Sequence, residues 1–444
     1  MQKDMLDARF TLKEVEKTIK AKTKGTDSSL SLSPSQALPS SSIVSIFDSN
    51  RLQIRNLQAL SDLVFLSYWK FYVNYFYAPV ITTMKKIYIK EVLQLLKNLT
   101  AYEKDPNVNL VMIKGNGKAF SAGGDLISLL QFGSAGYGHW SFQAKYYYKL
   151  LTLLHLNATY KKPLITIVNG FVMGGGAGLS TFATFRIITE NTIFSMPEVK
   201  MGLTPNSGAG YFFSRLPGYF GEYMGLTGAR IDGAEMIACG LATHFVPSKD
   251  LVLLKSDLEE IAGLSMIMDI SKVNDTINKY AITPSLKQDS SLKKLKMINE
   301  CFSKATVENI LSSLVDLSIK NEDKLIIHSI RSMKDGSPSN LKIFLKLIRE
   351  GRMQKLEKCF VRDYNINVNI FSAKFSSDII EGTRAMLIEK DNKPRWNPSC
   401  LEEVKEEFVN KHFEEIDDDE FQPLVLDASR TLNHRLISMM RPNL

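Results

Sequence analysis

The sequence is poor in the residues that build metal sites and disulfide frameworks. It has four cysteines and six histidines among 444 residues, and no CxxC pair. Zinc clusters and disulfide-stapled domains need closely spaced cysteines, so neither is indicated and we expect no metal site. The chain therefore suits a reduced compartment. The four cysteines, separated by 62, 58 and 41 residues, are Cys239, Cys301, Cys359 and Cys400.

Three familiar signals are also missing. The GxxxxGK[ST] phosphate loop and the GxGxxG turn are absent, which removes the two commonest nucleotide-binding motifs. No secretory signal is present, and residues 1–24 carry seven Lys or Arg against four Asp or Glu, too acidic for a clean mitochondrial transit peptide. The net charge of +8 is too small for a histone-like protein, but it permits contact with RNA or a nucleotide cofactor.

What the sequence does contain is apolar material, 44% of its residues, enough for more than one packed lobe. Composition divides the chain into four parts. We expect a basic, serine-rich extension over residues 1–42, an α/β core over 43–260 and a mostly helical lobe over 261–415. A tail, first acidic and then basic, occupies 416–444.

An aromatic insert, "LVFLSYWKFYVNYFYAPV" at residues 63–80, interrupts the core. It has eight aromatic residues in eighteen. Lys70 and Asn74 near its middle would be costly in a membrane, so we expect no membrane span but burial against the protein's own body or a partner. Its basic and aromatic character would also suit RNA, although such lysines more often flank solvated helices. The lysines in question are Lys85, Lys86 and Lys90.

The core has the pattern of an α/β domain. Residues 109–115 and 163–170 are short apolar runs that end in glycine, which is typical of buried strands. Residues 185–198 indicate a strand pair with a turn at Glu190-Asn191. Helix-period segments dominate after residue 250. Two of these segments are residues 307–317 and 340–351.

Two glycine-rich turns carry the chemical information. They are "GKAFSAGGDL" at residues 117–126 and "NGFVMGGGAGLS" at 169–180. Glycine lets a ligand approach the main chain and leaves amide groups uncovered. Two such amides that converge would form an oxyanion hole for a thioester carbonyl. Taken singly, each turn is more often an ordinary tight connection between a strand and a helix.

Together with "FSMPEVKMGL" downstream, the turns resemble the crotonase (enoyl-CoA hydratase/isomerase) superfamily, and within it the 3-hydroxyisobutyryl-CoA hydrolases and their relatives. The stretches "SPSNLKIFLKLIREG" and "EGTRAMLIEKDNKPRWNP" extend the resemblance through the helical lobe, so that it covers about residues 43–415. It implies a crotonase-type twisted β-sheet layered with helices. It also implies a site for a CoA thioester, as substrate or bound ligand, with no other cofactor.

The resemblance also assigns roles to individual residues. It implies oxyanion amides at Gly124 and Gly175, and it makes Glu198 the general base or attacking acid. Asn206 stands where the hydrolases have an aspartate that activates water; an amide keeps the size of that group but cannot accept a proton. Three further departures are Thr204 for phenylalanine, Ser207 for a small apolar residue, and Leu150 where active hydrolases often have glutamate.

Two functions remain open at this stage. The first is a catalytically impaired relative that serves as a structural component of the mitochondrial ribosomal small subunit, with ribosomal proteins, or ribosomal proteins and rRNA, as partners. The second is an active mitochondrial 3-hydroxyisobutyryl-CoA hydrolase of valine breakdown. Both place the protein in the mitochondrial matrix. Asn206, Leu150 and the aromatic insert favour the first function.

Overall fold

The computed structural model describes residues 76–77, 87–115, 117–134, 139–264, 269–320 and 322–432. The expected N-terminal extension, most of the aromatic insert and the end of the tail lie outside these residues. The expected boundaries at residues 42, 260 and 415 stay predictions.

Two β-sheets form the centre of the described chain. The first is parallel throughout, in the order β1-β2-β4-β6-β9. Its strands are β1 (Phe76–Tyr77), β2 (Val111–Lys114), β4 (Leu164–Val168), β6 (Phe185–Ile188) and β9 (His244–Phe245). The second has the order β3-β5-β7-β8, with only β8 antiparallel to its neighbour. Its strands are β3 (Ala119–Ser121), β5 (Phe171–Met173), β7 (Ile193–Ser195) and β8 (Ile231–Asp232).

The chain passes repeatedly from the first sheet to the second. It does so from β2 to β3, from β4 to β5 and from β6 to β7, and each time a helix follows. The two strands expected at 109–115 and 163–170 are confirmed as β2 and β4. The turn at Glu190-Asn191 is also confirmed, but the strand pair expected over 185–198 is wrong. That turn carries the chain between sheets, so β6 pairs with β4 and β9 whereas β7 pairs with β5 and β8.

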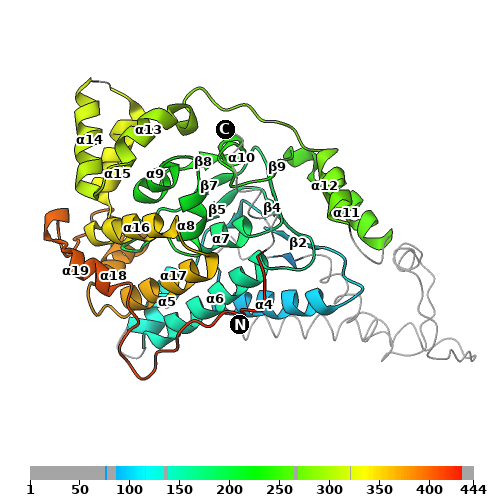
Figure 1. Cartoon of the computed structure of the whole chain (residues 1–444), viewed down its shortest axis with the longest axis horizontal. Coiled ribbons are helices and arrows are strands. Elements are labelled where there is room, and N and C mark those ends of the chain that lie inside the picture. The colour runs from blue at the N-terminus through cyan, green and yellow to red at the C-terminus, as the bar shows by residue number, and fades with distance from the viewer. Residues whose placement is uncertain are drawn as a thin grey trace, which may run out of the picture. The chain divides into compact units, whose positions relative to one another are not determined.

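The first sheet is covered on both faces. Alternate side chains of its strands pack against α11 (Leu251–Leu264) and α12 (Ile270–Asn278), while the residues between them join the main core. Figure 1 shows these two helices beside β2, β4 and β9. Burial on both faces explains why the strand segments are continuous apolar runs instead of alternating ones. The residues that face α11 and α12 are Leu110, Met112, Ile165, Ile167, Phe185 and Ile187.

The remaining helices surround the main core. Those that precede α11 are α4 (Ile89–Lys104), α5 (Leu126–Ser134), α6 (Ser141–Ala158), α7 (Gly175–Thr181), α8 (Ala209–Phe212), α9 (Phe220–Thr227) and α10 (Gly233–Ala238). Those of the C-terminal part are α13 (Leu295–Phe302), α14 (Val307–Lys320), α15 (Lys324–Asp335), α16 (Pro338–Gly351), α17 (Leu356–Phe371), α18 (Asp378–Thr383) and α19 (Glu406–Lys411). The helices expected at 307–317 and 340–351 are confirmed as α14 and α16.

Shorter helical turns complete the described chain. Five are 3-10 helices: η1 (Glu198–Met201), η2 (Phe213–Arg215), η3 (Ser248–Asp250), η4 (Ser291–Lys294) and η6 (Leu401–Glu403). One is a π-helical turn, η5 (Arg384–Ile388).

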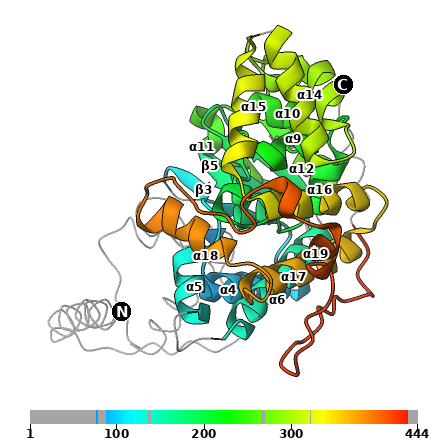
Figure 2. The ribbon, with the colours of Figure 1, turned by 90° about the vertical axis from the view of Figure 1, so that its left-hand side faces the viewer.

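Helices α16 and α17 connect the C-terminal part to the core. The Ser337 hydroxyl caps α16 by accepting from Asn340 N–H, and Pro338 occupies the first turn, where its missing N–H costs nothing. Helix α16 packs against α8 and α9, and α17 packs along α6. Figure 2 shows α17 beside α6. A carboxylate with no exposed surface, Glu222 on α9, receives both of its 2.8 Å hydrogen bonds from Arg352 at the end of α16.

Two described residues of the aromatic insert meet the sheet. Phe76 and Tyr77 form β1, which pairs in parallel with Ile113 and Lys114 of β2 at the sheet edge. These two residues of the insert therefore attach to the protein's own body by backbone hydrogen bonds, whereas the rest of residues 63–80 lies outside the described chain. Among the described helices, none has the length and apolar character to cross a bilayer.

Candidate active site

Glu198 is the first residue of η1, which begins three residues after the last residue of β7. Its side chain is buried, and its Oε1 lies 3.2 Å from the point that a Cβ on Gly174 would occupy. Within the described chain, Oε2 has no hydrogen-bond partner. Burial raises the pKa of the Glu198 carboxyl to about 8, because the charged form loses its hydration. A buried carboxyl with one unpaired oxygen is well suited to exchange a proton with a ligand.

The two glycine turns lie against each other beside this carboxyl. A Cβ on Gly174 would fall 3.3 Å from Gly123 Cα, so only glycine permits so close an approach, and both residues have positive φ. Gly124 bridges to Ile87, and Gly175 opens α7, where a helix has amides without intrahelical acceptors. The structure thus brings together Gly123 and Gly174, which precede the two predicted oxyanion residues, and Gly174 lies next to Glu198. Their catalytic roles stay predictions.

Asn206 is buried and held at both ends of its amide. Its Nδ2 donates to Asn367 Oδ1 at 3.0 Å, and its Oδ1 accepts from the Ser207 hydroxyl at 2.7 Å. Burial raises the pKa of Tyr147 well above its usual range; this phenol is also hydrogen-bonded to Asn206 and lies within electrostatic range of Glu198. Asn206 therefore sits in a preformed network of neutral groups near the candidate acid.

Asp363 on α17 is a residue that the sequence argument missed. It is buried, its Oδ2 accepts from Gly208 N–H at 2.6 Å, and Oδ1 has no partner among the described residues. Burial raises its pKa to about 7. Asn367, which holds Asn206, follows one turn later on the same helix and donates to the Asp363 carbonyl. The spacing of Asp363 and Asn367 by four residues could have indicated that they share a polar helix face.

Two other departures from the hydrolase pattern are also located. Leu150 Cδ2 lies 3.6 Å from the point that a Cβ on Gly175 would occupy, so a buried apolar side chain stands beside the second glycine turn. The Thr204 hydroxyl is buried and donates to Asn340 Oδ1 of α16 at 2.9 Å. Because Asn340 already accepts a hydrogen bond from this hydroxyl, we expect the hydroxyl to bring little water into the site.

This combination of fold and site has counterparts among known proteins. The family model for enoyl-CoA hydratase/isomerase matches residues 84–413, so the chain belongs to that family. Within it, the chain is a 3-hydroxyisobutyryl-CoA hydrolase-like member. It is 46% identical to "3-hydroxyisobutyryl-CoA hydrolase 1" of Arabidopsis thaliana over 324 residues, which cover 73% of this chain and 84% of that protein.

Two further similarities bear on fold and function. The "Small ribosomal subunit protein mS47" of Arabidopsis thaliana is 35% identical over 361 residues, covering 81% of this chain and 84% of the relative. A crystal structure of a carnitinyl-CoA dehydratase from Mycobacterium thermoresistibile superposes with a TM-score of 0.68 at 27% identity, covering 77% of this chain and 93% of that one. The expected crotonase-type α/β fold is thereby confirmed.

Proposed function

We propose that this chain is a 3-hydroxyisobutyryl-CoA hydrolase-like protein that binds an acyl-CoA thioester but hydrolyses it slowly, and that it serves as a structural component of the mitochondrial ribosomal small subunit. In this role it resides in the matrix, bound to ribosomal proteins and rRNA. One observation carries the impairment: both ends of the Asn206 amide are engaged by protein groups.

The chemistry of the site supports slow turnover. A positioned acid or base typically contributes ~10²–10⁴ to a rate, and an amide cannot replace it. Glu198, with a pKa of about 8, is mostly protonated at neutral pH, so only a minor fraction of the protein carries the basic carboxylate there. Gly124 and Gly175 would still hold the thioester oxygen. The structural role is supported by the likeness to mS47, which is aligned over 361 residues.

Gradient sedimentation of native mitochondrial extract at low salt tests the structural role. We expect the protein to migrate with the small ribosomal subunit and to leave it at high salt. If the protein sediments alone at low salt, the structural role is wrong. Turnover of 3-hydroxyisobutyryl-CoA by the purified full-length chain is measured in parallel, and rapid hydrolysis would contradict the proposed impairment.

Active hydrolysis of 3-hydroxyisobutyryl-CoA is a second candidate function, favoured by the unpaired buried oxygen of Asp363. In that case Asp363 would supply the carboxylate that position 206 lacks. Asp363→Asn should then lower kcat by about 10²-fold. The Gly208 N–H keeps an acceptor in this variant, so the thermal midpoint should change little. If the wild-type chain turns over and Asp363→Asn turns over equally well, Asp363 is not the second acid.

A further inference from the structure

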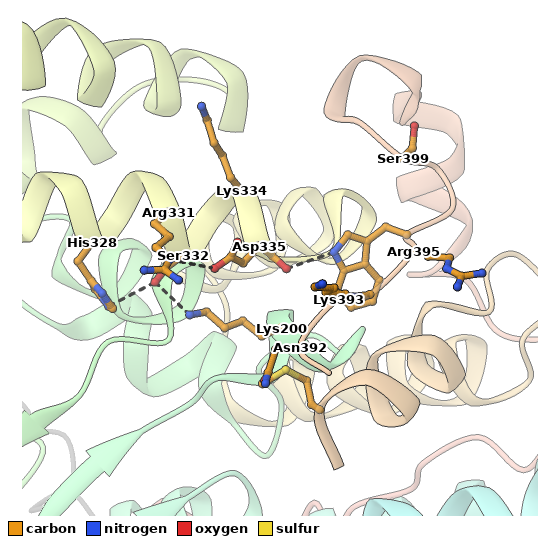
Figure 3. A pocket seen from close by; sticks show the side chains of 13 residues that line it. Lys200, His328, Arg331, Ser332, Lys334, Asp335, Asn392, Lys393, Arg395 and Ser399 are labelled. Carbon is orange, nitrogen blue, oxygen red and sulfur yellow. Dashed lines mark hydrogen bonds and ion pairs between the residues drawn. The ribbon is translucent and has the colours of Figure 1, made fainter. Parts of the chain in front are cut away.

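A cavity of about 930 Å³ is lined mainly by residues of the C-terminal part of the chain and lies outside the candidate active site. Figure 3 shows side chains from three separate stretches converging on it. Lys200 comes from η1, His328 to Asp335 come from α15, and the third wall is the segment 386–399. None of the candidate active-site residues lines this cavity. A cleft of this volume matches the size of sites for small molecules.

The lining of this basic cleft is strongly cationic. It contains five Lys or Arg side chains and one carboxylate, Asp335, which gives a formal charge of +4. Among the described residues, the only ion pair that these cations make is between Arg331 Nε and Asp335 Oδ2, at 3.9 Å within one helix. The five cationic residues are Lys200, Arg331, Lys334, Lys393 and Arg395. Such an excess of positive charge favours an anionic ligand.

The cations are crowded against one another. Lys200 Nζ donates to Ser332 Oγ at 3.1 Å, and Ser332 Oγ lies 3.3 Å from His328 Nε2, as Figure 3 shows. Burial lowers the pKa of Lys200 and of His328, and nearby Arg331 lowers both further. A bound anion would relieve this repulsion.

The cleft and the active site lie on different sides of η1. Glu198 and Lys200 are two residues apart in a 3-10 helix, in which each residue turns the direction of the side chain by about 120°. Glu198 faces the glycine turns, whereas Lys200 reaches Ser332 of α15. Ligands in the two places would therefore contact sides of one short helix that lie about 120° apart.

An indole provides the aromatic part of the cleft. Trp396 is half-buried, and its Nε1–H donates to the Asp335 carbonyl at 3.2 Å, which fixes the ring in the wall. Met386 and Pro394 add apolar surface nearby. A fixed aromatic ring next to several cations is the combination on which a nucleobase stacks while its phosphates are neutralised.

We propose that the basic cleft binds a nucleoside diphosphate, independently of the thioester site, with the phosphates on Lys200, Arg331 and Lys393 and the base against Trp396. A single phosphate would leave most of the cavity empty. Cations from three separate stretches instead suit a ligand with linked phosphates. This inference does not depend on the proposed ribosomal or hydrolytic role.

Isothermal titration of the full-length protein with ADP tests the proposal. We expect binding at low salt that weakens with added salt, and no binding of adenosine. Arg331→Ala combined with Lys393→Ala, both at exposed positions, should raise the Kd at least tenfold. Asp335→Asn should lower the Kd about threefold, because it removes the one competing carboxylate. Lys296→Ala, an exposed lysine on α13, is the matched control and should bind as the wild type does.

Three results would overturn the proposal. The first is unchanged ADP affinity in the double variant. The second is competition between CoA and ADP at one shared site, which would make the cleft the nucleotide end of the thioester site. The third is a single-stranded oligonucleotide that binds more tightly than ADP and loses affinity in the same variants, which would make the cleft an RNA surface.

Discussion

Replacing Asn206 by aspartate is expected to raise kcat for 3-hydroxyisobutyryl-CoA by about 10²-fold. The substitution restores a group that can accept a proton at the position where the hydrolase pattern has one. It keeps the side-chain volume, so the loop of residues 204–208 should hold its conformation. The measurement is steady-state hydrolysis by the full-length chain at several pH values, and the restored carboxylate should add a titration to the pH profile.

The neighbours of position 206 determine how much stability the Asn206→Asp variant loses. Asn367 Oδ1 now accepts from Asn206 Nδ2, and its own Nδ2 donates to the Asp363 carbonyl. The Asn367 amide would have to flip to donate to the new carboxylate, and it would then lose its hydrogen bond to the Asp363 carbonyl. The thermal midpoint of the variant should therefore fall. Asn365→Asp, on the same helix but bonded to the Phe413 carbonyl, is the control and should not raise kcat. A folded Asn206→Asp protein with wild-type turnover would refute the impairment argument.

Replacing Glu198 by glutamine is expected to remove about 10²-fold or more of whatever turnover the wild-type chain has. Glutamine preserves the shape of the side chain but cannot exchange a proton. In the Asn206→Asp background the same replacement should cancel the gain in kcat, because it removes the proton-exchanging group next to the glycine turns. Equal rates for wild type and Glu198→Gln would exclude a catalytic role for this carboxyl.

The same Glu198→Gln substitution should stabilise the fold at high pH. The pKa of this carboxyl rises from 4.5 to about 8 on folding. Below pH 4.5 the carboxyl is protonated in both states and does not make stability depend on pH. Between pH 4.5 and 8 only the unfolded state loses the proton, so stability falls as pH rises. Glutamine does not titrate, and we expect the variant to exceed the wild type by about 2–4 kcal/mol at pH 8.

Denaturant unfolding at pH 5 and pH 8 measures this effect. The difference between variant and wild type should be several times larger at pH 8. A difference that is the same at both pH values would mean that Glu198 is not the titrating group. Glu407→Gln, on the exposed face of α19, serves as the surface control.

Much of the fold is predictable from the sequence because local patterns specify it. β2 and β4 are buried on both faces, so their segments appear as unbroken apolar runs bounded by glycine. The partners of β6 and β7 could not be deduced in this way. A two-residue turn between apolar segments looks the same whether the strands pair or enter different sheets. β8 and β9 have two residues each, too few for any periodicity.

Only those residues of the candidate site that lie in the recognised motifs could be predicted from the sequence. Glu198, Gly124 and Gly175 lie in short glycine-rich stretches, and the structure brings these stretches together. Asp363 could not be placed, because it contacts Gly208 from 155 positions away in the sequence. Its surroundings depend on how α17 packs on α6, which no local pattern specifies.

The loop of residues 204–208 is anchored to two helices of the C-terminal part: Thr204 to Asn340 of α16, and Asn206 and Gly208 to Asn367 and Asp363 of α17. We expect these anchors to make the loop and both helices one cooperative unfolding unit, with amides that exchange with solvent at a shared opening free energy. A local fluctuation of the loop alone would break buried hydrogen bonds, so a substrate gate at this position would have to involve the two helices as well.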